Sequence, residues 1–151
     1  MAELKIRDIT VNDRDEYIGM FKDLYDSNAT TTEYDEEIAI LNFNNAISDS
    51  KLIRCLIFEY KDIVLGYAFL SFSYSTSKAS QCIWLEDLYI KEPARQKGVG
   101  SYFMAWLLKE YENKAKVVKL EVTKSNVCAK KFYERLNFLE SGYIEMYLNL
   151  K

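Results

Sequence analysis

The sequence predicts a mixed α/β fold in a single domain over residues 1–151. Two observations lead to this fold class. Apolar residues recur at helical spacing in four segments, and β-rich segments lie between them. Strands alternate with helices only in the later part of the chain, which favours a mixed sheet with helices on its faces. With 49% hydrophobic residues, the chain can bury a core of ordinary size.

The first half of the chain is expected to form a strand, two helices and a hairpin. The short first strand begins at Leu4. Asp13 with Glu16 resembles a capping box for the first helix, and apolar residues follow at helical spacing. A second helix is expected over residues 34–47, with acids in its first turns. Two β-rich runs within residues 52–75 predict the hairpin, with a tight turn at Lys61-Asp62.

The second half is expected to continue as strand, helix, strand, helix and strand. The strand over residues 82–90 leads into a glycine loop, and residues 103–111 place their apolar side chains on one helical face. Residues 118–122 alternate as a strand. Asn126 is a suitable N-cap for a helix to Leu136. Residues 143–150 predict a last strand.

Composition excludes several functional classes. The net charge of −3 gives no electrostatic argument for nucleic acid, and no apolar run approaches the ~18 residues of a membrane span. The charged N-terminus does not resemble a signal peptide, so a cytoplasmic protein is expected. The three cysteines lie far apart, and there is no histidine. Neither a disulfide framework nor a metal site is therefore expected.

The loop from Arg95 to Gly100 is suited to bind a phosphate. It lies between a strand and a helix, where free backbone N–H groups point toward an anion. Gly98 and Gly100 allow a tight turn and a close approach, and Arg95 and Lys97 add positive charge. A P-loop would need a Lys after Gly100, and a dinucleotide fingerprint would need a third glycine where Phe103 stands.

The loop instead has the pattern [RQ]-x-x-G-x-[GA] directly after a strand. This segment resembles the acetyl-CoA loop of the GCN5-related N-acetyltransferase (GNAT) superfamily. The preceding residues Leu85–Ile90 resemble the family's central strand, and especially the L-E-D strand of polyamine (diamine) acetyltransferases. Residues Asn126–Phe138 resemble the family block N-x-x-A-x-x-F-Y-x-x-x-G-F, with Asn137 in place of the glycine. Asn tolerates a left-handed helix end almost as well.

The resemblance covers the last half of the chain by motif and the first half by element order. It implies the GNAT (acyl-CoA N-acyltransferase) fold, with about six to seven strands flanked by four helices. The order of elements along the chain allows one more short strand near Phe138. It also implies acetyl-CoA as the acyl-donor cosubstrate. The residues expected to bind this cosubstrate are Leu88, Tyr89, Ile90, Arg95, Gln96, Lys97, Gly98, Val99, Gly100, Ser101, Asn126, Ala129, Phe132 and Tyr133.

The resemblance also implies catalytic roles. Tyr133 would protonate the departing thiolate, the alternative being an aromatic residue on an apolar helix face. The N–H of Leu88 would polarise the thioester carbonyl. Glu86 would take the amine proton, directly or through water, although a purely structural carboxylate is an equal alternative. Because a regular strand alternates, Glu86 and Asp87 are expected on opposite faces. Cys128, in the first turn of the last helix, is expected to be a small packing residue.

These roles predict direct attack of a primary amine, expected to belong to a small molecule, on acetyl-CoA. Three alternatives stay open at this point. The acceptor could be the amine of a protein or peptide, at an N-terminus or lysine. The chain could be a non-catalytic acyl-CoA sensor, or a nucleotide-binding module with the same loop. Dimers are common in the family, so a homodimer is considered.

Overall fold

The computed structural model describes residues 3–150. Five strands and four α-helices follow one another in the order β1-α1-α2-β2-β3-β4-α3-β5-α4. Short 3-10 helices lie before α1 (Val11–Asp13) and after β4 (Glu92–Ala94). The strands are β1 (Leu4–Asp8), β2 (Ile53–Tyr60), β3 (Ile63–Ser75), β4 (Ser80–Ile90) and β5 (Ala115–Leu120). The helices are α1 (Arg14–Tyr25), α2 (Glu36–Ala46), α3 (Val99–Glu110) and α4 (Val127–Arg135).

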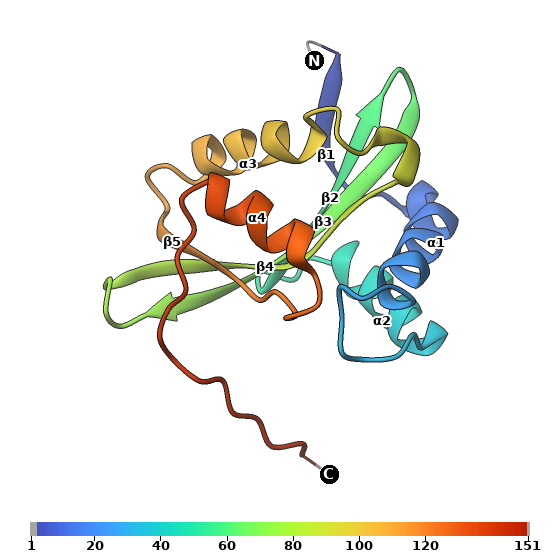
Figure 1. Ribbon diagram of the computed structural model, residues 1–151. Helices are drawn as coiled ribbons and strands as arrows, with labels where there is room; N and C mark the ends of the chain where they lie inside the picture. The colour runs from blue at the N-terminus through green and yellow to red at the C-terminus, as the bar shows by residue number, and fades with distance from the viewer. Residues whose placement is uncertain (1–2, 151) are drawn as a thin grey trace.

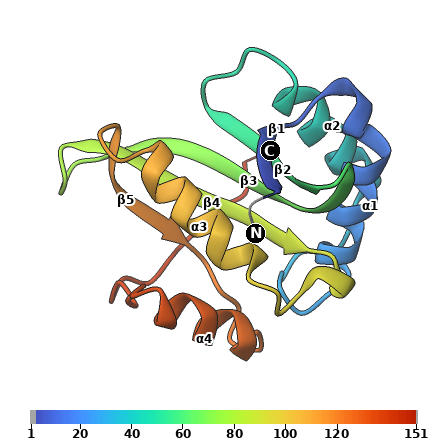
Figure 2. The same cartoon turned by 90° about the horizontal axis from the view of Figure 1, so that it is seen from above.

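The strands form one sheet in the order β1-β2-β3-β4-β5 (Figure 1). Neighbouring strands are antiparallel, except that β4 and β5 are parallel. Helices α1 and α2 cover one face, and α3 and α4 cover the other (Figure 2). Each face has its own apolar core, centred on Tyr17 and Phe21 of α1 on one side and on Phe103 and Leu107 of α3 on the other. The expected mixed α/β fold class is confirmed.

Several local expectations are confirmed. Lys61 and Asp62 both have positive φ, 49° and 64°, as a two-residue turn between β2 and β3 requires. The expected second helix is present as α2, and Asp35, which the sequence analysis did not select, caps it by accepting from the Glu37 amide at 2.9 Å. Asn126 caps α4, and Asn137 takes the left-handed conformation with φ of 68°. Asn can therefore serve where the family pattern has glycine.

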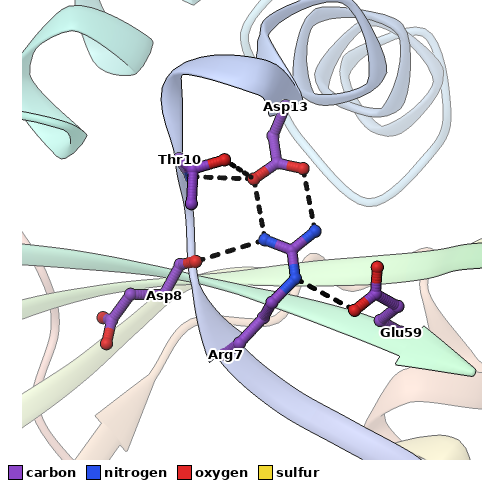
Figure 3. Close-up of polar contacts among 5 residues, drawn as sticks. All are labelled: Arg7, Asp8, Thr10, Asp13 and Glu59. Atoms are coloured by element: carbon purple, nitrogen blue, oxygen red, sulfur yellow. Dashed lines mark hydrogen bonds and ion pairs between the residues drawn. The ribbon is translucent and has the colours of Figure 1, made fainter. Parts of the chain in front are cut away.

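The expected capping box of Asp13 and Glu16 is wrong. The Asp13 carboxylate does not cap α1 and instead accepts two hydrogen bonds from the Arg7 guanidinium, at 2.8 and 2.9 Å (Figure 3). It also accepts from the amide and hydroxyl of Thr10. Arg7 donates a further bond to Glu59 on β2. These bonds tie the start of α1 to the β1–β2 edge and lower the pKa of Asp13.

The two strands expected after α4 are also absent from the described residues. Neither residues 143–150 nor the residues around Phe138 are in a strand, so the sheet has five strands where about six to seven were expected. A strand needs a neighbour for its backbone N–H and C=O groups. Within residues 3–150 the last segment has no neighbouring strand and extends away from the body (Figure 1).

Candidate active site

The parallel strands β4 and β5 separate in the middle of β4. Their pairing runs from Gln81 opposite Ala115 to Leu85 opposite Leu120 and ends there. Beyond Leu85, β4 continues to Ile90 with β3 as its partner strand among the described residues. The backbone edge of β4 that faces away from β3 is therefore open from residue 86 to residue 90.

The direction of the amides along this edge follows from one hydrogen bond. The Lys91 amide donates to the Leu65 carbonyl at 2.7 Å and thus faces β3. Because N–H groups alternate in direction along a strand, the amides of Tyr89 and Asp87 also face β3. The amides of Leu88 and Ile90 face away from β3, into the opening. This places the Leu88 N–H where the sequence expects a donor for the thioester.

The glycine loop continues this open edge. Gly98 has φ of 83° and precedes the first residue of α3. Across residues 3–150, no backbone or side-chain acceptor is found for the amides of residues 96–101. Gly100 is needed for packing as well, because a Cβ there would lie 3.1 Å from Cζ of Phe132 in α4. The loop thus presents free donors at the N-terminus of α3, a geometry that favours an anion.

Arg95 has a local role that the sequence does not indicate. Its Nε donates to the Ile90 carbonyl at 2.7 Å, and its guanidinium lies 5.6 Å from the centre of the Tyr89 ring. The Tyr89 hydroxyl in turn donates to Asp23 of α1 at 3.0 Å. The Tyr89 side chain therefore lies on the α1 side of the sheet. Because its amide faces β3, neither the side chain nor the N–H of Tyr89 reaches the open edge, so the expected role of Tyr89 in binding the cosubstrate is not supported.

A small cavity lies where β4 and β5 separate. Its wall combines four segments of the chain that are distant in sequence. They are residues 85–88 of β4, residues 120–122 at the end of β5, Asn126, Ala129 and Tyr133 at α4, and Leu24, Ala29 and Thr30 at the end of α1. The structure thus brings together Glu86, Leu88, Asn126, Ala129 and Tyr133, five of the residues expected from the sequence.

The expectation that Glu86 and Asp87 point to opposite faces is wrong. Phe69 pairs with Asp87 while the next residue of β3, Leu70, pairs with Leu85, so Glu86 is the extra residue of a β-bulge. A bulge shifts the alternation by one position. Both carboxylates consequently meet hydroxyls of alternate β3 residues: Glu86 accepts from Ser71 at 2.6 Å, and Asp87 accepts from Tyr67 at 2.9 Å.

Asp87 is a site residue that the sequence analysis did not select. Its side chain is buried, with 8% exposed, while Glu86 is exposed. The pKa of Asp87 is raised to about 6, mainly by burial and also by the charge of Glu86, while hydrogen bonds from Tyr67 and Tyr25 oppose the rise. A carboxyl group with a pKa near neutrality can exchange protons readily at physiological pH. The bulge that brings it here leaves no clear signal in the sequence.

Tyr133 faces the cavity from α4. Its ring packs against Phe132 and Phe138, with ring centres 5.1 and 5.5 Å away. Burial raises the pKa of Tyr133 to about 12, so the phenol keeps its proton at neutral pH. A protonated phenol beside the open edge can act as a proton donor.

Three further groups of residues lie around the site. The side chains of Leu88, Ile90 and Phe132 pack against the core below α3, so the strand residues among them can act only through backbone groups. Lys97 is exposed at the loop, and Cys128 is exposed on α4. Glu121, which the sequence analysis did not select, lies at the cavity wall, and a hydrogen bond with Glu145 raises its pKa to about 7.

Comparison with known proteins identifies the family. The model of the acetyltransferase (GNAT) family matches residues 16–138, so the chain belongs to this family. No curated protein sequence matches the chain significantly. The motifs in the glycine loop and in Asn126–Phe138 therefore belong to the family they resemble, whereas the polyamine subtype is not established.

Solved structures agree with the fold. A possible acetyltransferase from Clostridium difficile 630 has a TM-score of 0.84 and 18% identity, covering 98% of both chains. The aminoglycoside N-acetyltransferase AAC(6')-Iy in complex with CoA has a TM-score of 0.79 and 17% identity, covering 97% of this chain and 94% of that one. The aminoglycoside acetyltransferase meta-AAC0020, from an uncultured soil sample, has a TM-score of 0.73 and 16% identity, covering 99% and 98%. At these identities the likeness establishes the fold alone.

Two kinds of structural feature are absent from residues 3–150. No helix in this range is both long and apolar enough to cross a membrane. No group of three or more His, Cys, Asp or Glu side chains in this range is arranged to hold a metal ion.

Proposed function

We propose that the protein transfers an acetyl group from acetyl-CoA to a primary amine of a small molecule, by direct attack in a ternary complex. The observation that carries this proposal is the open edge of β4, which leads directly into the free amides of residues 96–101. A ligand with an extended arm that ends in a phosphate can bind both groups of donors, the arm along the outward amides of β4 and the phosphate at the free amides of residues 96–101. No other part of the described chain combines the two features.

The loop and α4 hold the donor in this proposal. Free amides from Gln96 to Ser101, including those of Lys97 and Val99, bind the pyrophosphate at the start of α3. The backbone of Leu88 and Ile90 pairs with the pantetheine arm. Asn126 and Ala129 line the other side of the opening, and Phe132 packs beside Gly100 of the loop. Arg95 supports the end of β4 through the Ile90 carbonyl, in addition to adding charge.

The chemistry needs three groups from the chain. The Leu88 N–H donates to the thioester oxygen as negative charge develops there. The nitrogen of the acceptor amine bonds to the acetyl carbon. One of the adjacent carboxylates, Glu86 or Asp87, accepts the proton that the amine loses. The carbon–sulfur bond breaks, and Tyr133 gives its proton to the thiolate. The family resemblance implies Glu86 as the base, whereas the pKa of Asp87, about 6, lies nearer to neutral pH.

The acceptor site is the acidic end of the cavity. Glu86, Asp87 and Glu121 line it together and would attract a cationic amine. Several of the similar structures are aminoglycoside acetyltransferases, whose acceptors carry several amines. We therefore propose a small molecule with more than one amino group, a class that includes the polyamines implied by the L-E-D strand.

A turnover screen tests the proposal. Purified protein is incubated with acetyl-CoA and a panel of diamines, polyamines, aminoglycosides and lysine or N-terminal peptides, and the products are identified by mass spectrometry. Acetylated small amines are expected. Acetylated peptides alone would reassign the acceptor to proteins. CoA binding by calorimetry without any product would indicate an acyl-CoA sensor, and both results would overturn the proposed function.

A further inference from the structure

A buried phenol and a buried carboxyl group form a pair beside the cavity. The Tyr67 hydroxyl on β3 donates to Oδ2 of Asp87 on β4 at 2.9 Å. Tyr67 is fully buried and Asp87 is 8% exposed, yet Asp87 also lines the cavity where β4 and β5 separate. One member of the pair therefore belongs to the core, and the other lies at the surface of the cavity.

The β-bulge at Glu86 brings the two side chains together. After the bulge, Tyr67 lies opposite Tyr89, and Phe69 lies opposite Asp87. The side chains of Tyr67, Phe69 and Tyr89 all pack in the α1-side core. Because residues two apart on a strand share a face, Asp87 points toward the same core as Tyr89. A carboxylate in such surroundings is costly unless it accepts hydrogen bonds, and Tyr67 provides one.

The ring of Tyr67 is held from two sides. Its centre lies 5.1 Å from that of Tyr17 on α1 and 6.3 Å from that of Tyr89 on β4. The packed ring fixes the position of its hydroxyl, and the hydroxyl in turn orients the carboxylate that accepts from it. Glu86, by contrast, has a longer and exposed side chain, which must lose more conformational freedom before it can act on a substrate.

Asp87 has no counter-ion among the described residues. No Lys or Arg side chain within residues 3–150 forms an ion pair with it. Acidic side chains are almost never buried in proteins unless they are paired. The protonated amine of an acceptor that enters the cavity would supply the missing positive charge.

We propose that Tyr67 is a positioning residue, which holds the Asp87 carboxylate at the cavity and thereby makes Asp87, and not Glu86, the group that takes the proton of the acceptor. Given the acetyl transfer proposed above, on which this role depends, the bound ammonium gives one proton to Asp87. The lone pair left on nitrogen forms the bond to the acetyl carbon, and the carbon–sulfur bond breaks. Over one turnover the nitrogen loses two protons, of which one ends on the CoA sulfur and one in the solvent.

The groups around Asp87 determine the sign of the expected effect. Burial and the charge of Glu86 raise the pKa of Asp87, whereas hydrogen bonds from Tyr67 and Tyr25 lower it. Burial raises the pKa of Tyr67 itself, so its hydroxyl stays a donor while Asp87 titrates. The other titratable side chains near Asp87, from α1, β2 and the cavity wall, are Tyr17, Cys55, Glu121 and Tyr133. Loss of the Tyr67 hydroxyl should therefore raise the pKa of Asp87.

Tyr67→Phe tests this role with two readouts. In the protein alone, carbon-13 NMR of the Asp87 carboxyl carbon is expected to show proton binding about tenfold tighter than in the unmodified protein. The second readout is the kcat/KM for the amine, taken as a ratio of variant to unmodified protein so that ionisation of the amine cancels. With an Asp87 pKa of about 6, this ratio should be about tenfold lower at pH 5 than at pH 9.

Tyr17→Phe is the matched control. Tyr17 is as buried as Tyr67 and lies in the same core, but its hydroxyl has no hydrogen-bond partner within the described part of the chain. The control removes the same atom from the same core. It is expected to leave both the Asp87 titration and the ratio of rates unchanged. Equal effects of the two substitutions would show a general disturbance of the core and would overturn the role of Tyr67.

The two readouts also separate failure of this role from failure of the proposed function. An unchanged Asp87 titration in Tyr67→Phe would overturn the role, because the hydroxyl would not act on the carboxylate. A shifted titration with equal rate ratios at pH 5 and pH 9 would show that another group takes the proton, while acetyl transfer itself would stand. Absence of any acetylated amine with the unmodified protein would overturn the proposed function and this role together.

Discussion

Burial of the Asp87 carboxyl group is expected to make the fold less stable at neutral pH than at acid pH. Its pKa rises from 3.8 to about 6, mainly because it is buried, and one pKa unit corresponds to about 1.4 kcal/mol. A raised pKa means that the folded state holds the proton more tightly than the unfolded chain does. The resulting stability is present below pH 3.8 and is lost as the pH rises through 6, to a total of about 3 kcal/mol at pH 8.

Asp87→Asn removes this titration and keeps an oxygen that can accept from the Tyr67 hydroxyl. The free energy of unfolding of the variant is expected to exceed that of the unmodified protein by about 3 kcal/mol at pH 8 and by about 1 kcal/mol at pH 4.5. The difference between the two pH values is the decisive quantity, because costs of the substitution that do not depend on pH cancel. Urea unfolding with a slope of ~2 kcal/mol per M would place this difference at about 1 M in the midpoint.

Glu86→Gln is the matched control, because Glu86 is the exposed neighbour of Asp87. It is expected to change stability by no more than ~0.5 kcal/mol at either pH. If the stability difference between Asp87→Asn and the unmodified protein were the same at pH 4.5 and pH 8, the claim that burial raises the pKa of Asp87 would be refuted. The rate of acetyl transfer, measured as a function of pH in both variants, separates the catalytic roles of Asp87 and Glu86. The residue whose substitution removes the change in rate near pH 6 is the base.

Three further predictions concern packing, proton donation and the ion pair of α1. Gly100→Ala should lower stability in thermal unfolding by about 1 kcal/mol, because the new Cβ meets a ring atom at 3.1 Å. Gly19→Ala in α1, with nothing within 4 Å, should raise it by about 0.5–1 kcal/mol. Tyr133→Phe should reduce kcat at least ~100-fold without weakening CoA binding in calorimetry. Arg7→Met should lower stability to urea by about 2–4 kcal/mol at pH 7, and by less as Asp13 becomes protonated below pH 3.8.

Each of these predictions has an outcome that contradicts it. Equal stability changes for Gly100→Ala and Gly19→Ala would remove the packing argument for the loop. Unchanged turnover by Tyr133→Phe would exclude the phenol as the proton donor. A constant loss in Arg7→Met from pH 7 to pH 3 would show that the Asp13 carboxylate is not what depends on Arg7.

Residues with a strong local signal were predictable from the sequence. The turn at Lys61-Asp62, the cap at Asn126 and the left-handed Asn137 depend on contacts within a few residues. The turn in the glycine loop is also a local feature, because the backbone of residue 98 has a positive φ of 83° that glycine adopts readily. The elements around the site therefore follow from local chemistry, and their order gives the fold class.

Features that depend on distant partners were not predictable. Asp13 matched a capping pattern, but Arg7 competes for its carboxylate from β1. The shared face of Glu86 and Asp87 results from a bulge set by pairing with β3. Residues 143–150 have the alternation of a strand, yet a strand also needs a neighbouring strand to pair with, and these residues have none within residues 3–150.

The central claim is that the outward amides of β4 and the free amides of the glycine loop bind acetyl-CoA. Backbone amide NMR of nitrogen-15-labelled protein, titrated with CoA, tests it residue by residue. The amides of Leu88, Ile90 and residues 96–101 are expected to shift most, while those of Asp87 and Tyr89, which face β3, shift less. Largest shifts elsewhere in the chain, or the same shifts with ATP in place of CoA, would contradict the account.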